Sequence, residues 1–318
     1  MGITIGGMKR TATNRPPIGT PPVLPSVRWT VIILLALLAV SCAQTPEITG
    51  TDGEELPGSV ASMERIRLDG IEQWIVIRGE NRHAPVLLWL AGGPGGSEIG
   101  WTREYLGALE QDFVLVNWEQ PGSGKSAKWS DIGTLTPDRF VEQTVLLSEY
   151  LADRFKKRRI VLVGHSWGSI IGLRAAAARP DLYHAYVGVG QQVNAGENDL
   201  LGYELVLREA RARGEERLVA RLEEQGPPPY SVEEKGSYVR LFQKLSVLSP
   251  RAPGSSEPSF WSFIHPTEYT LLDSVRLIRS VLDGVNYIYP QLRDLDFEEE
   301  IPRLEVPLIL VHGRYDYT

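Results

Sequence analysis

A short buried strand that runs into a serine between two glycines constrains the fold of this chain more than any other feature. Residues 160–163 are all apolar, which is the pattern of a strand buried on both faces of a sheet. They lead into GHSWG at 164–168, and an alanine-rich stretch with a helical pattern follows over 169–179. Strand, sharp turn and helix form the context that the G-x-S-x-G nucleophile motif requires. We therefore predict that Ser166 is a nucleophile raised above the sheet rather than part of an ordinary glycine-serine turn.

Further apolar runs alternate with helical patterns along the chain. A hairpin is predicted from 63–68 and 71–77, which meet at Asp69-Gly70. The other predicted strands are short and buried, and they comprise Val86–Leu90, Phe113–Trp118, Tyr183–Val189 and Val306–Val311. Short apolar strands separated by helices are typical of a mostly parallel sheet with helices on both faces, so the fold class is α/β.

This rhythm breaks between residues 192 and 302, where the sequence is charged and mostly helical in pattern. We predict that this segment is a helical cap inserted between two strands of one sheet. The core is then discontinuous and comprises residues 61–191 and 303–318. A net charge of −7 argues against a protein that binds nucleic acid through a basic face.

Two glycine-rich segments follow strands. One predicts an oxyanion-binding loop, and the other only resembles a phosphate-binding loop. The loop AGGPGG at 91–96 can bring backbone N–H groups close to a substrate, and we expect Gly93 and Trp167 to donate to an oxyanion. The segment GSGKS at 122–126 ends like a phosphate-binding loop, but Glu119 stands where that motif requires its first glycine. A nucleotide site is therefore not predicted. Asp316, after the last strand, is the expected acid of a Ser-His-Asp triad.

With these residues assembled, the chain resembles the proline iminopeptidase group of α/β-hydrolases over residues 60–318. The resemblance rests on AGGPGG at 91–96, WEQPGSGKS at 118–126, GHSWGS at 164–169 and VHGRYD at 311–316. It implies a serine hydrolase without a cofactor or metal that removes N-terminal residues, often proline, from peptides. The chain departs from the group at Ala91, where histidine is usual, and at Glu119-Gln120-Pro121, where Asp-Gln-Arg is usual.

The resemblance also implies that acidic residues of the cap hold the free amine of a peptide. Glu197 and Glu204 lie at the start of the cap and are the candidates, although Glu204 also fits a charged surface helix. Trp261 is a candidate for lining the pocket, and the alternative for this aromatic cluster is the core of the cap.

No histidine follows Asp316, where the triad order places the catalytic base. We expect that the sequence is a fragment of a longer reading frame, that its final strand and helix are missing, and that the chain as given is inactive. Two alternatives stay open: an esterase or amidase of the same fold, and a non-catalytic hydrolase-like binding lipoprotein if the truncation is natural.

The N-terminal region reads as a targeting segment. A basic lead precedes an apolar run over 31–40 that is too short to span a bilayer, and the only cysteine, Cys42, follows it. Residues 1–42 therefore resemble a signal peptide with a lipobox, and the alternative is a plain signal peptide or an uncleaved anchor with an incidental cysteine. We expect lipidation at Cys42, a flexible tether over 43–60, and a location on the bacterial cell envelope, periplasmic or outer-membrane in a Gram-negative source.

Overall fold

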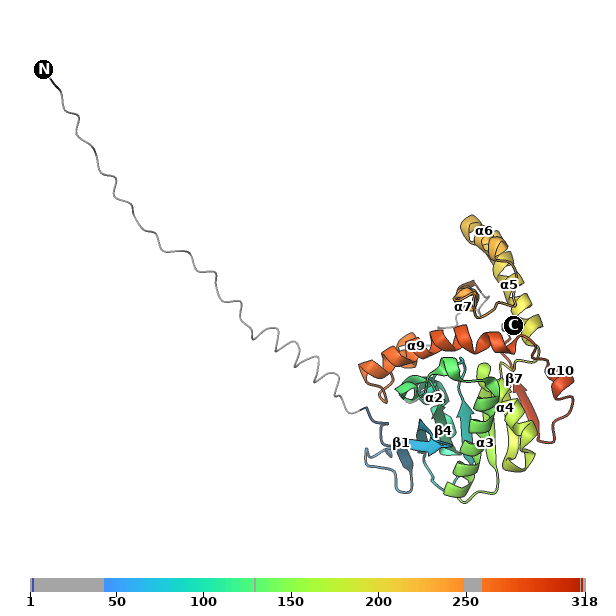
Figure 1. Ribbon diagram of the computed structural model, residues 1–318. Coiled ribbons are helices and arrows are strands. Elements are labelled where there is room, and N and C mark those ends of the chain that lie inside the picture. The colour runs from blue at the N-terminus through green and yellow to red at the C-terminus, as the bar shows by residue number, and fades with distance from the viewer. Residues whose placement is uncertain (1, 3–42, 129, 249–258, 315, 317–318) are drawn as a thin grey trace. The chain divides into compact units, whose positions relative to one another are not determined.

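The computed structural model describes residues 2, 43–128, 130–248, 259–314 and 316. Their strands form one seven-stranded sheet in the order β1-β2-β4-β3-β5-β6-β7 (Figure 1). The first two pairings are antiparallel and the others are parallel. The strands are β1 Val60–Leu68, β2 Ile71–Gly79, β3 Val86–Leu90, β4 Val114–Glu119, β5 Ile160–His165, β6 Tyr183–Val189 and β7 Leu308–Val311. The predicted α/β class and mostly parallel sheet are confirmed.

The hairpin of β1 and β2 turns at Asp69 and Gly70, as the sequence predicts. Both residues have positive φ angles, 42° and 79°. Such a turn matches the twist of the flanking strands, which is why Asp-Gly favours it. Leu68 pairs with Ile71 across the turn.

Alternate side chains of the central strands enter two different cores. Leu88 and Leu162 pack on the face covered by α3 (Pro137–Arg154) and α4 (Trp167–Ala178). Their neighbours Leu87 and Val163 pack on the other face, together with side chains from α2 (Ile99–Leu106) and the following 3-10 turn. Burial on both faces explains why the strands read as continuous apolar runs.

Helices occupy the segment between β6 and β7 that is predicted to be the cap. Its helices are α5 Ala195–Ala212, α6 Glu216–Gln225, α7 Ser237–Leu248, α8 Phe260–Ile264, α9 Leu271–Tyr287 and α10 Phe297–Glu300. In Figure 1, α9 lies across one end of the sheet, and α5 and α6 extend away from it. Gly95 and Gly284 permit close packing of α9: a Cβ on Gly284 would lie 2.3 Å from the Pro94 carbonyl oxygen. The cap therefore rests directly on the loop after β3.

The segment 43–60, predicted to be a flexible tether, instead makes specific contacts with the folded core. Ile48 is buried, and the Thr45 hydroxyl accepts a hydrogen bond of 3.0 Å from Arg78. The prediction was wrong because these contacts reach residues far along the chain, which a local pattern does not reveal. The signal peptide and lipobox predicted over 1–42, including Cys42, lie outside the described residues. In the described ranges, no helix has the length and apolar character needed to cross a bilayer.

Candidate active site

Ser166 occupies a sharp turn between β5 and α4. Its φ and ψ angles are 52° and −119°, a conformation that L-residues rarely adopt. Its N–H donates a hydrogen bond of 2.9 Å to the Val189 carbonyl at the end of β6. Strain of this kind persists only where the surroundings hold it, and it is concentrated at functional sites.

The two glycines that flank Ser166 are required by close backbone contacts. A Cβ on Gly164 would lie 2.4 Å from the Gly168 carbonyl oxygen. A Cβ on Gly168 would lie 2.1 Å from the carbonyl oxygen of Leu90, at the end of β3. Helix α4 therefore starts against β3 at a distance that excludes any side chain, which is the physical reason that the sequence motif implied.

The loop that follows β3 passes beside the serine. A Cβ on Gly92 would lie 3.3 Å from Ser166 Cβ, and Gly93 has a φ of 143° that favours glycine. The Gly92 N–H donates to Glu98. Among the described residues, no turn or loop bond to a backbone carbonyl involves the N–H of Gly93 or Trp167; their role as oxyanion donors stays a prediction.

Asp316 follows β7 and lies at the same end of the sheet as Ser166, where the parallel strands have their carboxyl ends. The Gly190 N–H donates 2.9 Å to the Val311 carbonyl, which aligns the ends of β6 and β7. A Cβ on Gly190 would lie 3.7 Å from Asp316 Oδ2. The structure therefore brings Asp316 to the end of β6, whose last residue, Val189, also holds Ser166.

No described histidine forms a hydrogen bond with Ser166 or Asp316. His165 Nδ1 lies 2.6 Å from Glu98 Oε1, and His265 Nδ1 lies 2.8 Å from the Ser274 hydroxyl in the cap. His83, His184 and His312 are exposed. The described part of the chain also contains no group of three or more His, Cys, Asp or Glu residues placed to hold a metal ion.

Gln120 connects the serine turn to the glycine loop, a role that the sequence did not suggest. Its Nε2 donates 3.0 Å to the Ala91 carbonyl, and its Oε1 accepts 2.9 Å from Trp167 Nε1. The side chain is fully buried. Because both bonds are side-chain contacts between distant segments, no motif in the sequence could have predicted them.

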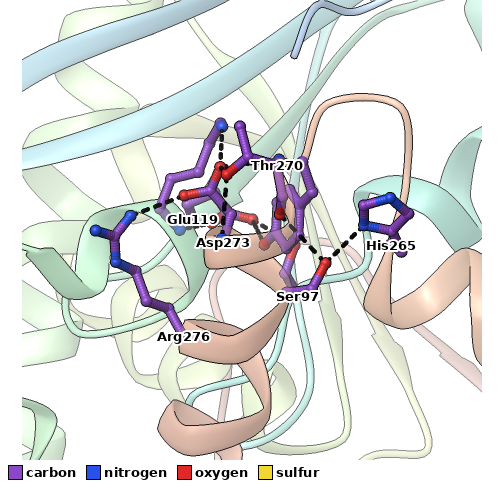
Figure 2. Close-up of polar contacts among 9 residues, drawn as sticks. Ser97, Glu119, His265, Thr270, Asp273 and Arg276 are labelled. Atoms are coloured by element: carbon purple, nitrogen blue, oxygen red, sulfur yellow. Dashed lines mark hydrogen bonds and ion pairs between the residues drawn. The ribbon is translucent and has the colours of Figure 1, made fainter. Parts of the chain in front are cut away.

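Glu119 is a second buried acid near the glycine loop. It accepts hydrogen bonds from Ser97, from the Tyr269 hydroxyl at 2.5 Å and from the Lys125 N–H at 2.7 Å. Burial raises the pKa of Glu119. Because Tyr269 belongs to the segment between β6 and β7, its hydroxyl joins the core to the cap at Glu119. Figure 2 draws Glu119 together with Asp273 at the start of α9.

The three substrate-binding candidates lie on the surface of the cap. Glu197 and Glu204 are exposed on α5, and Trp261 is 63% exposed on α8. Among the described residues, none of them hydrogen-bonds to Ser166 or the glycine loop. The buried acid of α5 is Asp199, which accepts 2.9 Å from the Tyr289 hydroxyl and was not predicted. The positions of the acidic residues along α5 do not by themselves indicate which of them faces the interior.

Comparison with known proteins shows what the chain is similar to. Residues 85–224 match the α/β hydrolase fold family. A Bacillus subtilis protein named probable aminopeptidase YbaC is 29% identical over 264 residues, covering 81% of this chain and 82% of its own. Proline iminopeptidase of Saccharolobus solfataricus is 26% identical over 252 residues, covering 76% of this chain and 72% of its own.

The fold also matches solved structures. Proline iminopeptidase of Mycobacterium smegmatis superposes with a TM-score of 0.58 at 18% identity, covering 80% of this chain and 83% of that one. The chain therefore has the α/β-hydrolase fold and is similar to proteins named aminopeptidase and proline iminopeptidase.

Proposed function

We propose that this α/β-hydrolase-fold protein is a serine hydrolase that removes N-terminal residues from peptides, with proline as the first residue to test. The observation that carries the proposal is the position of Ser166, strained at the strand-helix turn and beside the glycine loop. The relatives named aminopeptidase and proline iminopeptidase support a peptide substrate.

In the proposed mechanism, the Ser166 hydroxyl attacks the carbonyl carbon of the first peptide bond while a histidine accepts its proton. The N–H groups of Gly93 and Trp167 stabilise the oxyanion. The same histidine then protonates the leaving amine, and an acyl-enzyme remains. Water hydrolyses the acyl-enzyme by the same route, and Asp316 orients the imidazole and stabilises its cation.

We propose that the histidine belongs to a segment that follows Thr318. The exposure of β7, the strand at one edge of the sheet, supports this assignment. All four residues of β7 are 47–53% exposed, although each is apolar. Beside β7 lies an open groove of about 370 Å³ that includes Leu173, Val193 and Phe297 in its lining. An apolar edge strand of this kind is normally covered by further chain.

Active-site labelling tests the proposal. The protein from its complete reading frame is treated with a fluorophosphonate probe, and we expect modification of Ser166 that is lost in Ser166→Ala and retained in Ser62→Ala. Hydrolysis of proline 4-nitroanilide exceeding that of 4-nitrophenyl acetate supports the aminopeptidase, and the reverse supports an esterase. A folded protein that is neither labelled nor active would overturn the proposal and favour a binding protein.

We further propose that the protein is exported and carries a lipid on Cys42. The sequence before Cys42 supports this location. Metabolic labelling with an alkyne palmitate analogue tests this, because the label should be lost in Cys42→Ser.

A further inference from the structure

Glu98 is a buried acid that the serine mechanism does not use. It stands at the N-cap position of α2, but its side chain makes no capping hydrogen bond with that helix. The residue is only 6% exposed. A buried carboxylate is costly unless it is paired and hydrogen-bonded, so its partners indicate its role.

The partners of Glu98 come from three different segments. Oε2 accepts 2.6 Å from Trp89 Nε1, on β3. Oε1 accepts 3.0 Å from the Gly92 N–H and lies 2.6 Å from His165 Nδ1. One oxygen atom therefore holds both the glycine loop and the end of β5.

The Glu98 carboxylate favours the protonated form of His165. Burial lowers the pKa of His165, but the hydrogen bond and charge of Glu98, together with the charge of Asp316, outweigh burial and raise it. Hydrogen bonds in which the donor or the acceptor is ionised are shorter and stronger than those between neutral groups.

The two groups held by Oε1 each precede a residue of the proposed chemistry. Gly92 precedes Gly93, the proposed oxyanion donor, and His165 precedes Ser166. A Cβ on Gly92 would lie 3.3 Å from Ser166 Cβ and 3.4 Å from His165 Nδ1, so the Gly92 backbone lies beside both of these side chains. A displacement of about 1 Å between a nucleophile and its oxyanion donors can reduce the rate about 100-fold.

We propose that Glu98 is a positioning residue that fixes the glycine loop against the nucleophile turn by holding Gly92 and His165 with one carboxylate oxygen. The inference rests on the proposed serine-hydrolase function. Trp89, bound to the other oxygen, orients the carboxylate but does not contact the serine turn through this bond.

The test compares variants of the protein from its complete reading frame. Glu98→Leu removes both contacts, Glu98→Gln keeps an oxygen that can accept from Gly92, and Trp89→Phe is the matched control that removes only the bond to Oε2. We expect Glu98→Leu to lower the rate of fluorophosphonate labelling at Ser166 about 10- to 100-fold. The loss should appear in kcat for proline 4-nitroanilide with little change in KM. Glu98→Gln should recover most of the rate, and Trp89→Phe should stay within about threefold of the parent.

Amide hydrogen exchange at Gly92 supplies a measurement that does not depend on activity. We expect exchange at least about tenfold faster in Glu98→Leu than in the parent and Trp89→Phe, because the buried acceptor is lost. If Glu98→Leu does not fold, Glu98→Asp replaces it, since the shorter acid keeps its charge but cannot reach both partners.

Each outcome then has one meaning. Labelling of Glu98→Leu at the parent's rate overturns the positioning role and leaves the serine hydrolase intact. A folded parent without labelling or activity overturns the proposed function. Amide exchange at Gly92 then tests separately whether Glu98 holds the loop, and exchange that is unchanged in Glu98→Leu overturns the positioning role as well.

Discussion

Lys125 Nζ lies 2.7 Å from Asp273 Oδ2, and this ion pair joins the loop after β4 to the first turn of α9. The two side chains are only 9% and 7% exposed. Asp273 also forms a capping box with Thr270, so the start of α9 and its attachment to the core share one carboxylate. The part of the cap that rests on the glycine loop is thereby fixed to the core by buried charge.

We expect Lys125→Met to lower the free energy of unfolding by about 3 kcal/mol at pH 7, because Asp273 is left with a buried and less compensated charge. The double variant Lys125→Met/Asp273→Leu should recover part of this loss. Urea unfolding measures both. Arg279→Met is the control, since Arg279 forms an exposed pair with Asp283 and should change stability by less than about 0.5 kcal/mol. Equal effects of Lys125→Met and Arg279→Met would contradict the role of the buried pair.

The sequence predicted those parts of the fold that depend on local backbone geometry. A few adjacent residues encode both the Asp69-Gly70 turn and the turn at Ser166. Their backbone angles or close contacts favour particular residue types, above all glycine. Strands were recognised because burial on both faces leaves an uninterrupted apolar run. Such signals need no knowledge of distant neighbours.

The polar networks of the site could not be predicted in this way. Tyr269 reaches Glu119 across 150 positions of the chain, and Gln120 reaches Ala91 across 29. The acids of α5 differ in burial because α5 packs against α7 and Tyr289. Asp199 is buried, whereas Glu197 and Glu204 are exposed. Long-range packing decides which acid becomes buried, and the sequence of a single helix does not contain it.

The glycine of the serine turn provides a direct test of the geometry. We expect Gly168→Ala to lower the free energy of unfolding by more than about 2 kcal/mol, because its Cβ would lie 2.1 Å from the Leu90 carbonyl oxygen. Gly196→Ala is the matched control in the first turn of α5, where the nearest atom is 3.6 Å away. That variant should gain up to about 1 kcal/mol from the lower entropy of its unfolded state. Thermal unfolding compares the two, and a neutral Gly168→Ala would refute the close approach.

Asp316→Asn should reduce fluorophosphonate labelling of Ser166 by about 10³-fold or more in the protein from its complete reading frame, because the amide cannot stabilise a charged imidazole. Asp316 is exposed, so stability should not change. Asp181→Asn is the control, since this acid pairs with Arg179 on the surface. Labelling that is equally fast in Asp316→Asn would show that another acid supports the base.

The buried acid of the cap predicts a dependence of stability on pH. Burial raises the pKa of Asp199 from 3.8 to about 6, with the Tyr289 hydroxyl as a hydrogen-bond partner. Between these pH values the unfolded state has lost the proton and the folded state keeps it, so the contribution of Asp199 to stability falls as the pH rises from about 4 to about 6. Asp199→Asn keeps an acceptor for Tyr289 and has no charge to bury. We expect the variant to gain about 1–3 kcal/mol relative to the parent between pH 4 and pH 7, measured by urea unfolding at both values. A constant difference across this range would mean that Asp199 titrates normally and is not buried as the structure shows.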